Sequence, residues 1–161
     1  MKRNATLCLL PLAAMAASPV QSATTCWDDD AVGAARVMEF QIAMMIATLR
    51  CTALNMNMEA DFKRFADNNK TVLKEADTRL KKQFGGTGKA SHIVYQNYQT
   101  RVSNQHSNRD STIQTCTLFR EVASELGKSE TSAATVVSFA NALVPEPWID
   151  GTRCVQTAGT K

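Results

Sequence analysis

The sequence lacks a strong excess of charge of either sign. It contains 18 lysines and arginines against 15 aspartates and glutamates, and loss of Lys2 and Arg3 with an N-terminal signal would leave a net charge of +1. Proteins that bind nucleic acid electrostatically carry a basic patch or stripe, and the sequence shows no cluster of that kind. We therefore expect no nucleic-acid partner.

The sequence also lacks the short motifs of common enzymes and cofactor sites. It contains no GxSxG, HExxH, P-loop or GxGxxG motif, no close CxxC pair and no CxxCH for covalent haem. The two histidines, His92 and His106, would lie about four turns apart on one straight helix, which is too far to bind one ion. These absences predict no cofactor and favour a protein that is not an enzyme. The alternatives are a small envelope hydrolase whose residues converge only in the fold, or a noncovalent haem held by one methionine and one histidine.

The N-terminus, residues 1–23, has the layout of a secretory signal peptide. Lys2 and Arg3 precede a short apolar run, 7–17, and small residues follow in "SPVQSA". Such a segment is removed on export, and the run is shorter than the roughly 20 residues of a membrane-spanning helix. We expect a periplasmic or secreted protein without a membrane span.

Residues 24–161 are predicted to form a single helical domain with an irregular C-terminal tail. Apolar residues recur every three or four positions, as in amphipathic helices, and no segment has the alternation of a strand. The expected fold is therefore an all-α bundle of about five helices with short connections. The predicted helices cover residues 28–51, 57–84, 90–106, 110–126 (ending at Gly127) and 129–143 (capped by Ser129).

The first of these helices is predicted to be central, because two apolar seams cover most of its sides. The seams contain Ala35, Met38, Ile42, Met45 and Leu49, and Val37, Phe40, Met44, Ala47 and Cys51. A narrow stripe through Arg36, Glu39, Ala43 and Arg50 is left for solvent. In the later helices, the residues expected to face inward include Asn69, whose buried amide would need partners, and Val94, Tyr95, Tyr98, Val102, Ile113, Cys116, Phe119, Val122, Leu126, Val136, Val137 and Ala140.

Four cysteines stay in the chain after the signal is removed, and an even number in an exported protein indicates two disulfides. In an up-and-down bundle, the end of the first helix lies beside the start of the fourth, so Cys51 is expected to pair with Cys116. Cys26 and Cys154 would then join the two ends of the domain. A four-cysteine metal site is the alternative, but the wide spacings do not match those of zinc modules.

Three segments, "CWDDDAVGAARVMEFQIAMMIATLRC", "DFKRFADNNKTVLKEADTRLKKQF" and "YQNYQTRVSN", resemble a group of short exported bacterial proteins of unknown function. Members have a Cys-Trp opening, an apolar helix that ends in Leu-Arg-Cys, and two later cysteines. The likeness covers residues 26–104 and, beyond them, only the cysteine spacing. Some members carry the name S-adenosylhomocysteine hydrolase, which belongs to a much longer NAD-dependent cytosolic enzyme. This chain has no GxGxxG after a strand, so it lacks the NAD-binding motif that this name would imply. The resemblance implies the helical fold and export, and it supplies no catalytic residues.

Two clusters are candidates for binding. Met56 and Met58 form a Met-x-Met pair at a predicted turn, and thioether sulfur is a soft ligand for Cu(I), although methionine is also common core material. One helix carries a polar and aromatic face that could line a groove for a small ligand or peptide; its residues are His92, Tyr95, Tyr98, Gln99 and Arg101. Alternatively, its tyrosines close the edge of the core and its polar residues meet water. The sequence favours a binding or envelope-associated structural module, whose partner is a protein, a peptide or an envelope component.

Overall fold

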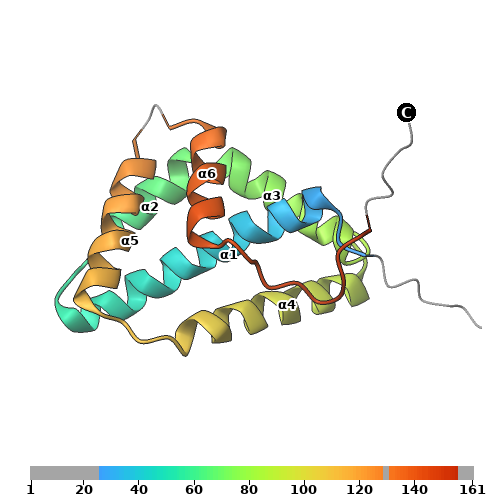
Figure 1. The fold of residues 1–161 in the computed structure, drawn as a ribbon, viewed down its shortest axis with the longest axis horizontal. Helices are drawn as coiled ribbons and strands as arrows, with labels where there is room; N and C mark the ends of the chain where they lie inside the picture. The colour runs from blue at the N-terminus through green and yellow to red at the C-terminus, as the bar shows by residue number, and fades with distance from the viewer. Residues whose placement is uncertain (1–25, 129–130, 156–161) are drawn as a thin grey trace, which may run out of the picture.

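The computed structural model describes residues 26–128 and 131–155, and these residues form an all-helical bundle (Figure 1). The elements follow in the order α1 (Asp29–Cys51), η1 (Thr52–Leu54), α2 (Glu59–Asn68), α3 (Lys70–Gln83), α4 (Lys89–Ser107), α5 (Ile113–Leu126) and α6 (Ala133–Leu143). The predicted all-α, disulfide-stapled bundle is therefore confirmed. The predicted signal peptide, residues 1–23, lies outside the described residues.

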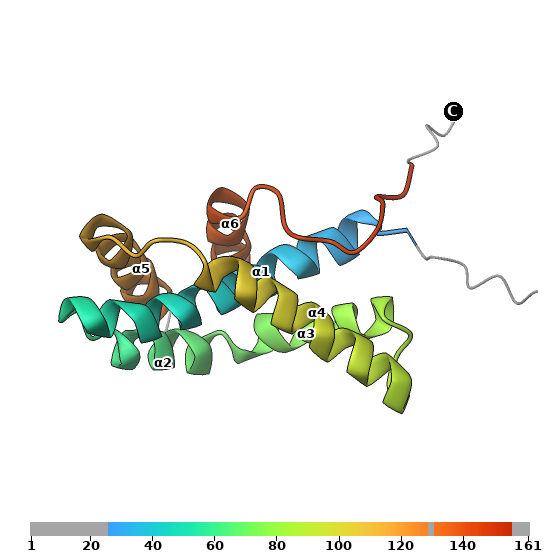
Figure 2. The ribbon, with the colours of Figure 1, turned by 90° about the horizontal axis from the view of Figure 1, so that it is seen from below.

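Helix α1 is central, as its two apolar seams predict. It contacts α2, α3, α4, α5 and α6, and Figures 1 and 2 show the other helices arranged around it. The side chain of Asp28 caps α1 by accepting a hydrogen bond from the backbone N–H of Ala31 (2.8 Å). Together with η1, this helix is long and apolar enough to cross a membrane, yet 72% of its most apolar window is buried inside the bundle. Packing against the other helices therefore accounts for its apolar composition.

The faces of α1 differ from the prediction at four positions. Met45 and Leu49 were expected to face inward but are exposed, Leu49 to 71%. Glu39 and Ala43 were expected to face solvent but are buried. The seam that contains Cys51 contacts both α2, through Phe40 and Phe65, and α5, through the disulfide, and Met45 and Leu49 lie off that seam. The chain after α6 lies over Glu39, because it bonds to the Glu39 side chain.

The predicted helix over residues 57–84 is wrong in its continuity, because the chain forms two helices that meet at Asn69. The buried Asn69 amide donates hydrogen bonds to the carbonyl oxygens of Phe65 (2.8 Å) and Leu126 (2.6 Å). The prediction that this amide needs partners is confirmed. The bond to Leu126 connects the α2–α3 junction to the end of α5.

Glycine at position 127 allows α2 and α5 to approach closely. A Cβ atom at Gly127 would lie 3.0 Å from the Ala123 carbonyl oxygen and 3.1 Å from Arg64 Cβ. The Asn68 side-chain amide also donates to the Gly127 carbonyl oxygen (2.6 Å). The end of α5 predicted from this glycine is confirmed.

Helices α5 and α6 begin with hydroxyl caps. The side chain of Thr112 accepts from the N–H of Thr115 (3.1 Å), and that of Ser132 accepts from Thr135 (3.2 Å). Helix α6 therefore begins later than predicted, and Ser129 lies outside the described residues.

Three residues predicted to face inward on these later helices are exposed instead: Val94, Ile113 and Val137. Each helix covers the core with a narrower stripe than its apolar pattern indicates. On α4 the buried residues are Tyr95, Tyr98 and Val102, so Val94 lies beside that stripe.

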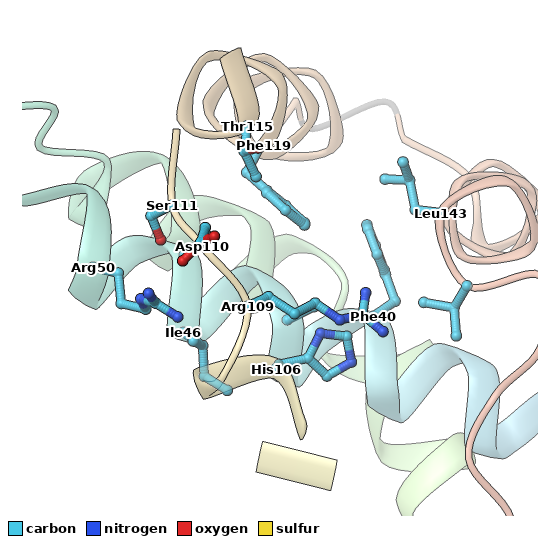
Figure 3. Close-up of a pocket in the computed structure, with 13 residues that line it drawn as sticks. Phe40, Ile46, Arg50, His106, Arg109, Asp110, Ser111, Thr115, Phe119 and Leu143 are labelled. Carbon is cyan, nitrogen blue, oxygen red and sulfur yellow. The ribbon is translucent and has the colours of Figure 1, made fainter. Parts of the chain in front are cut away.

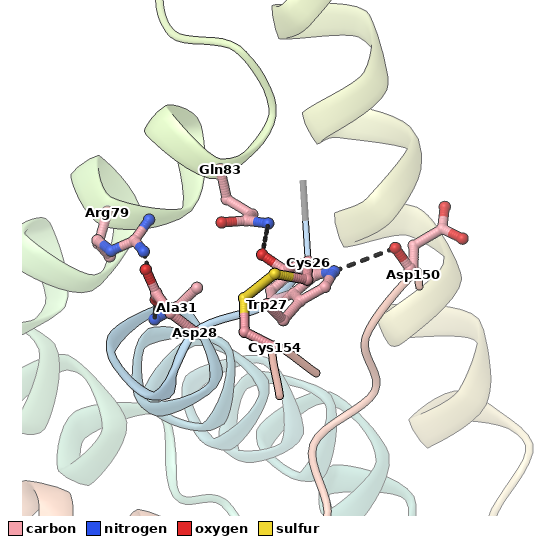
Figure 4. Close-up of a disulfide and its surroundings, with 8 residues drawn as sticks. All are labelled: Cys26, Trp27, Asp28, Ala31, Arg79, Gln83, Asp150 and Cys154. Atoms are coloured by element: carbon pink, nitrogen blue, oxygen red, sulfur yellow. Dashed lines mark hydrogen bonds and ion pairs between the residues drawn. A yellow bond between two sulfur atoms is a disulfide. The ribbon is translucent and has the colours of Figure 1, made fainter. Parts of the chain in front are cut away.

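Both predicted disulfides form. Cys51 pairs with Cys116, with 5.7 Å between their Cα atoms, and Cys26 pairs with Cys154, with 4.9 Å between theirs. The first bond connects the end of α1 to α5, and the second connects the two ends of the described chain (Figure 4).

Trp27 also binds the C-terminal segment. Its backbone N–H donates to the Thr152 carbonyl oxygen, and its own carbonyl oxygen accepts from the N–H of Cys154, both at 2.9 Å. The indole N–H of the buried Trp27 donates to the Asp150 carbonyl oxygen (3.1 Å; Figure 4). The segment after α6 is therefore held along α1 although it forms no helix of its own.

Candidate functional site

A pocket of about 270 Å³ opens between α1, α5, the end of α6 and the connection from α4 to α5 (Figure 3). Its floor is apolar and is made by Phe40, Ala43, Ile46, Ala47, Phe119, Leu143 and Val144. Its rim is polar and is made by Arg50, His106, Arg109, Asp110, Ser111 and Thr115. An apolar cavity with a few polar groups at its edge is the usual form of a small-ligand site.

Two tethers position the rim. The disulfide between Cys51 and Cys116 joins the two helices that form opposite walls. The Arg50 guanidinium donates to the Ser107 carbonyl oxygen (2.5 Å), which ties the end of α4 to α1. The short connection that carries Arg109 is therefore fixed close to the floor at both of its ends.

A buried polar pair lies at the side of the pocket. Glu39 Oε1 is 2.9 Å from His106 Nε2, and Glu39 Oε2 accepts the backbone N–H of Trp148 (2.7 Å). The Glu39 side chain is 3% exposed and that of His106 is 9% exposed. One carboxyl group therefore connects α1, α4 and the C-terminal segment in the protein interior.

Sequence reasoning missed this pair. It placed Glu39 on the solvent stripe and considered His106 only as a metal or haem ligand. One signal was present, because Glu39 is the only acidic residue between Asp30 and Glu59. A lone acid within a long apolar helix is a candidate for a buried, paired group.

The Arg109 guanidinium differs from that of Arg50, which is bonded to the Ser107 carbonyl oxygen. Figure 3 shows its side chain reaching from the connection into the pocket, toward His106 and Phe40. Within the described part of the chain it has no hydrogen bond or ion pair. It is therefore an exposed cation beside an apolar floor, with no side-chain partner among the described residues.

The predicted polar and aromatic face of α4 is not an open groove. Tyr95 and Tyr98 are both 2% exposed, and their rings pack with those of Trp27, Phe84 and Trp148. This agrees with the alternative in which the tyrosines belong to the core.

The polar atoms of these tyrosines have partners in the protein. The Tyr95 hydroxyl donates to Asp77 Oδ1 (2.7 Å), and the Tyr98 hydroxyl donates to the Trp148 carbonyl oxygen (3.2 Å). Burial raises the pKa of both phenols well above the usual range, and the neighbouring charges of Asp77 for Tyr95 and Glu39 for Tyr98 add to the effect.

The other three residues of that face are separated by their contacts. Gln99 donates to the Tyr95 hydroxyl (3.1 Å), and Arg101 pairs with Asp150 (3.2 Å), whereas His92 is exposed. None of the five predicted residues lines the pocket described above.

The predicted methionine pair is divided between core and edge. Met58 is 1% exposed and belongs to the core, and Met56 is partly buried against it. Within the described residues, no group of three or more histidine, cysteine, aspartate or glutamate side chains could hold a metal ion. The structure therefore places the sulfur of Met58 in packing rather than at an open turn.

No family model matches the chain, and no curated protein or solved structure is significantly similar to it. The chemistry of the pocket is thus the main guide to function.

Proposed function

We propose that this chain is an exported binding protein, periplasmic or secreted, and that the pocket beside His106 is its binding site. The observation that carries the proposal is an apolar floor next to an arginine that has no side-chain partner among the described residues. A ligand that covers this floor gains from the removal of apolar surface from water. It can also give Arg109 a partner.

Two features support binding over catalysis. All four cysteines of the described chain are in disulfides, which removes the thiol as a nucleophile. Both carboxyl oxygens of Glu39 already accept hydrogen bonds from within the protein, so this group has a structural role.

A fragment screen by ligand-observed NMR on the oxidised chain tests the site. We expect neutral apolar fragments to bind, and we expect Ala43→Leu and Thr115→Leu, which fill the pocket from opposite walls, to weaken them about tenfold or more. Ala60→Leu on α2 is the matched control, because Ala60 is an exposed helical alanine outside the pocket. The proposal would be contradicted if no fragment bound, or if the two filled variants bound the fragments as tightly as the unmodified chain does.

Export is tested separately. The two disulfides and the N-terminal apolar segment support it, because disulfides persist in oxidising compartments. Protein recovered from outside the cytoplasm should begin near residue 24 when its N-terminus is sequenced. Recovery only from the cytosol, with residues 1–23 retained, would refute this part.

One observation favours a second function, that of a small envelope hydrolase. His106 lines the pocket and is held by a carboxyl group, the arrangement by which a general base is oriented. Because Nε2 faces Glu39, Nδ1 would be the basic atom and water the nucleophile. Hydrolysis of nitrophenyl acetate that falls to background in a folded His106→Gln variant would support this function, and equal rates for the two proteins would exclude it for this substrate.

A further inference from the structure

We propose that the ligand of this pocket is a small amphipathic carboxylate, with its apolar body on the floor and its carboxylate on the guanidinium of Arg109. This inference rests on the proposed function and specifies the class of ligand. It follows from the distribution of charge around the rim and from the size of the cavity.

The rim carries three charged side chains besides His106, and they are arranged unequally. Arg50 is bonded to the Ser107 carbonyl oxygen, and Asp110 lies on the Arg50 side of the connection in Figure 3. Arg109 reaches the other side of the pocket, next to His106. No ion pair joins Asp110 to either arginine among the described residues, and of the two arginines Arg109 is the one that reaches toward His106 without a bond to the protein.

The buried carboxyl group of Glu39, which lies behind the rim, does not remove the preference of Arg109 for an anion. Glu39 uses one oxygen for His106 and the other for the Trp148 N–H. With a side-chain exposure of 3%, it presents almost no surface to a ligand. Because His106 lines the pocket and Glu39 lies behind it, an anion bound at Arg109 would contact His106 rather than Glu39.

A single free guanidinium suits a carboxylate better than a more highly charged group. Its planar fork binds the two oxygens of a carboxylate in a bidentate geometry. A phosphate monoester would bring a second negative charge without a second free cation at that end and with Asp110 on the same rim. The head group is thus expected to be a monoanion.

The floor sets the body of the ligand. Ala43 and Ala47 leave space on α1, and the rings of Phe40 and Phe119 line that space. A cavity of about 270 Å³ is near the lower end of the range for small-molecule sites, roughly 300–1,000 Å³. A short aromatic or branched aliphatic body fits these walls, whereas a long acyl chain would extend into solvent.

Three probes that share one body and differ in their head group test the inference. Hydrocinnamate, hydrocinnamyl alcohol and hydrocinnamylamine are titrated calorimetrically into the oxidised mature chain at low ionic strength. We expect the carboxylate to bind about tenfold or more tightly than the other two, because a hydrogen bond to a charged group is stronger than a neutral one. In Arg109→Gln, binding of the carboxylate should fall to the level of the alcohol, and binding of the alcohol should not change.

Arg120→Gln is the matched control, because Arg120 is an exposed arginine of α5 that does not line this pocket. It should leave all three affinities unchanged. Equal binding of the alcohol or the amine by the unmodified chain, a carboxylate preference that persists in Arg109→Gln, or no binding of hydrocinnamate would each overturn the ligand class. The screen with neutral fragments reports separately on whether the pocket binds at all, so the two failures are distinguishable.

Discussion

Replacement of Glu39 by alanine is expected to destabilise the fold strongly, because this residue joins three segments of the chain. Its carboxyl group holds the His106 ring and the Trp148 backbone N–H at 2.9 and 2.7 Å. No buried side-chain nitrogen or oxygen among the described residues is without a hydrogen-bond partner. Glu39→Ala would therefore remove the acceptor of the His106 ring and of the Trp148 N–H from an interior whose described side-chain polar atoms are all paired.

The size of the effect follows from what each partner can do afterwards. An unsatisfied buried donor costs roughly 1–3 kcal/mol, and among the described residues the Trp148 N–H donates to Glu39 alone. His106 lines the pocket, so water can replace part of its lost bond. We expect a total loss of about 3 kcal/mol in the free energy of unfolding. Glu39→Gln keeps an acceptor for one of the two donors, so its loss should be about 1 kcal/mol.

Urea denaturation of the oxidised protein measures both losses, with tryptophan fluorescence and far-ultraviolet circular dichroism as two probes of one transition. Glu75→Ala is the control, because Glu75 is an exposed acid of α3 outside any ion pair described for this chain. Its effect should stay within about 0.5 kcal/mol. If Glu39→Ala costs no more than Glu75→Ala, the tie between α1, α4 and the C-terminal segment does not exist in solution.

Two further predictions concern the framework around this tie. Replacing both Cys51 and Cys116 by alanine should lower the free energy of unfolding by about 4 kcal/mol, because the loop-entropy model gives that value for a sequence separation of 65; a loss below about 1 kcal/mol in urea would contradict it. Tyr95 and Tyr98, the only tyrosines of the chain, have raised pKa values through burial and, for Tyr95, through Asp77. Their contribution to stability is thus complete below the unfolded pKa of about 10 and is lost as the pH rises through the folded values. Phenolate absorbance should appear only together with alkaline unfolding, and a gradual titration near pH 10 with unchanged circular dichroism would refute the burial.

Much of the framework could be predicted from local patterns. The two seams of the first helix are sufficient to make it central, and the up-and-down order brings Cys51 to Cys116. The break at Asn69 could not be predicted in the same way, because the stripe of apolar residues continues through it. The Asn69 amide at that break bonds to the Leu126 carbonyl oxygen, which is distant in sequence.

The pocket could not be predicted from the periodicity of apolar residues, for a related reason. Periodicity indicates how wide the apolar part of a helix is, but not which neighbour covers each side. Met45 and Leu49 have the pattern of core residues and are nevertheless exposed. The residues that form the pocket come from four separate segments, and only the fold brings them together.

The stripe on α1 that was expected to face solvent is where the irregular parts of the chain bind. Arg36 donates to the carbonyl oxygens of Val144 and Pro145, both at 2.9 Å. Glu39 accepts the Trp148 N–H, and Arg50 holds the end of α4. Backbone groups outside helices need partners as much as those inside them, and here side chains of the central helix supply several. The polar residues of this stripe therefore indicated a surface that another part of the chain would occupy, and the pocket lies where that cover ends.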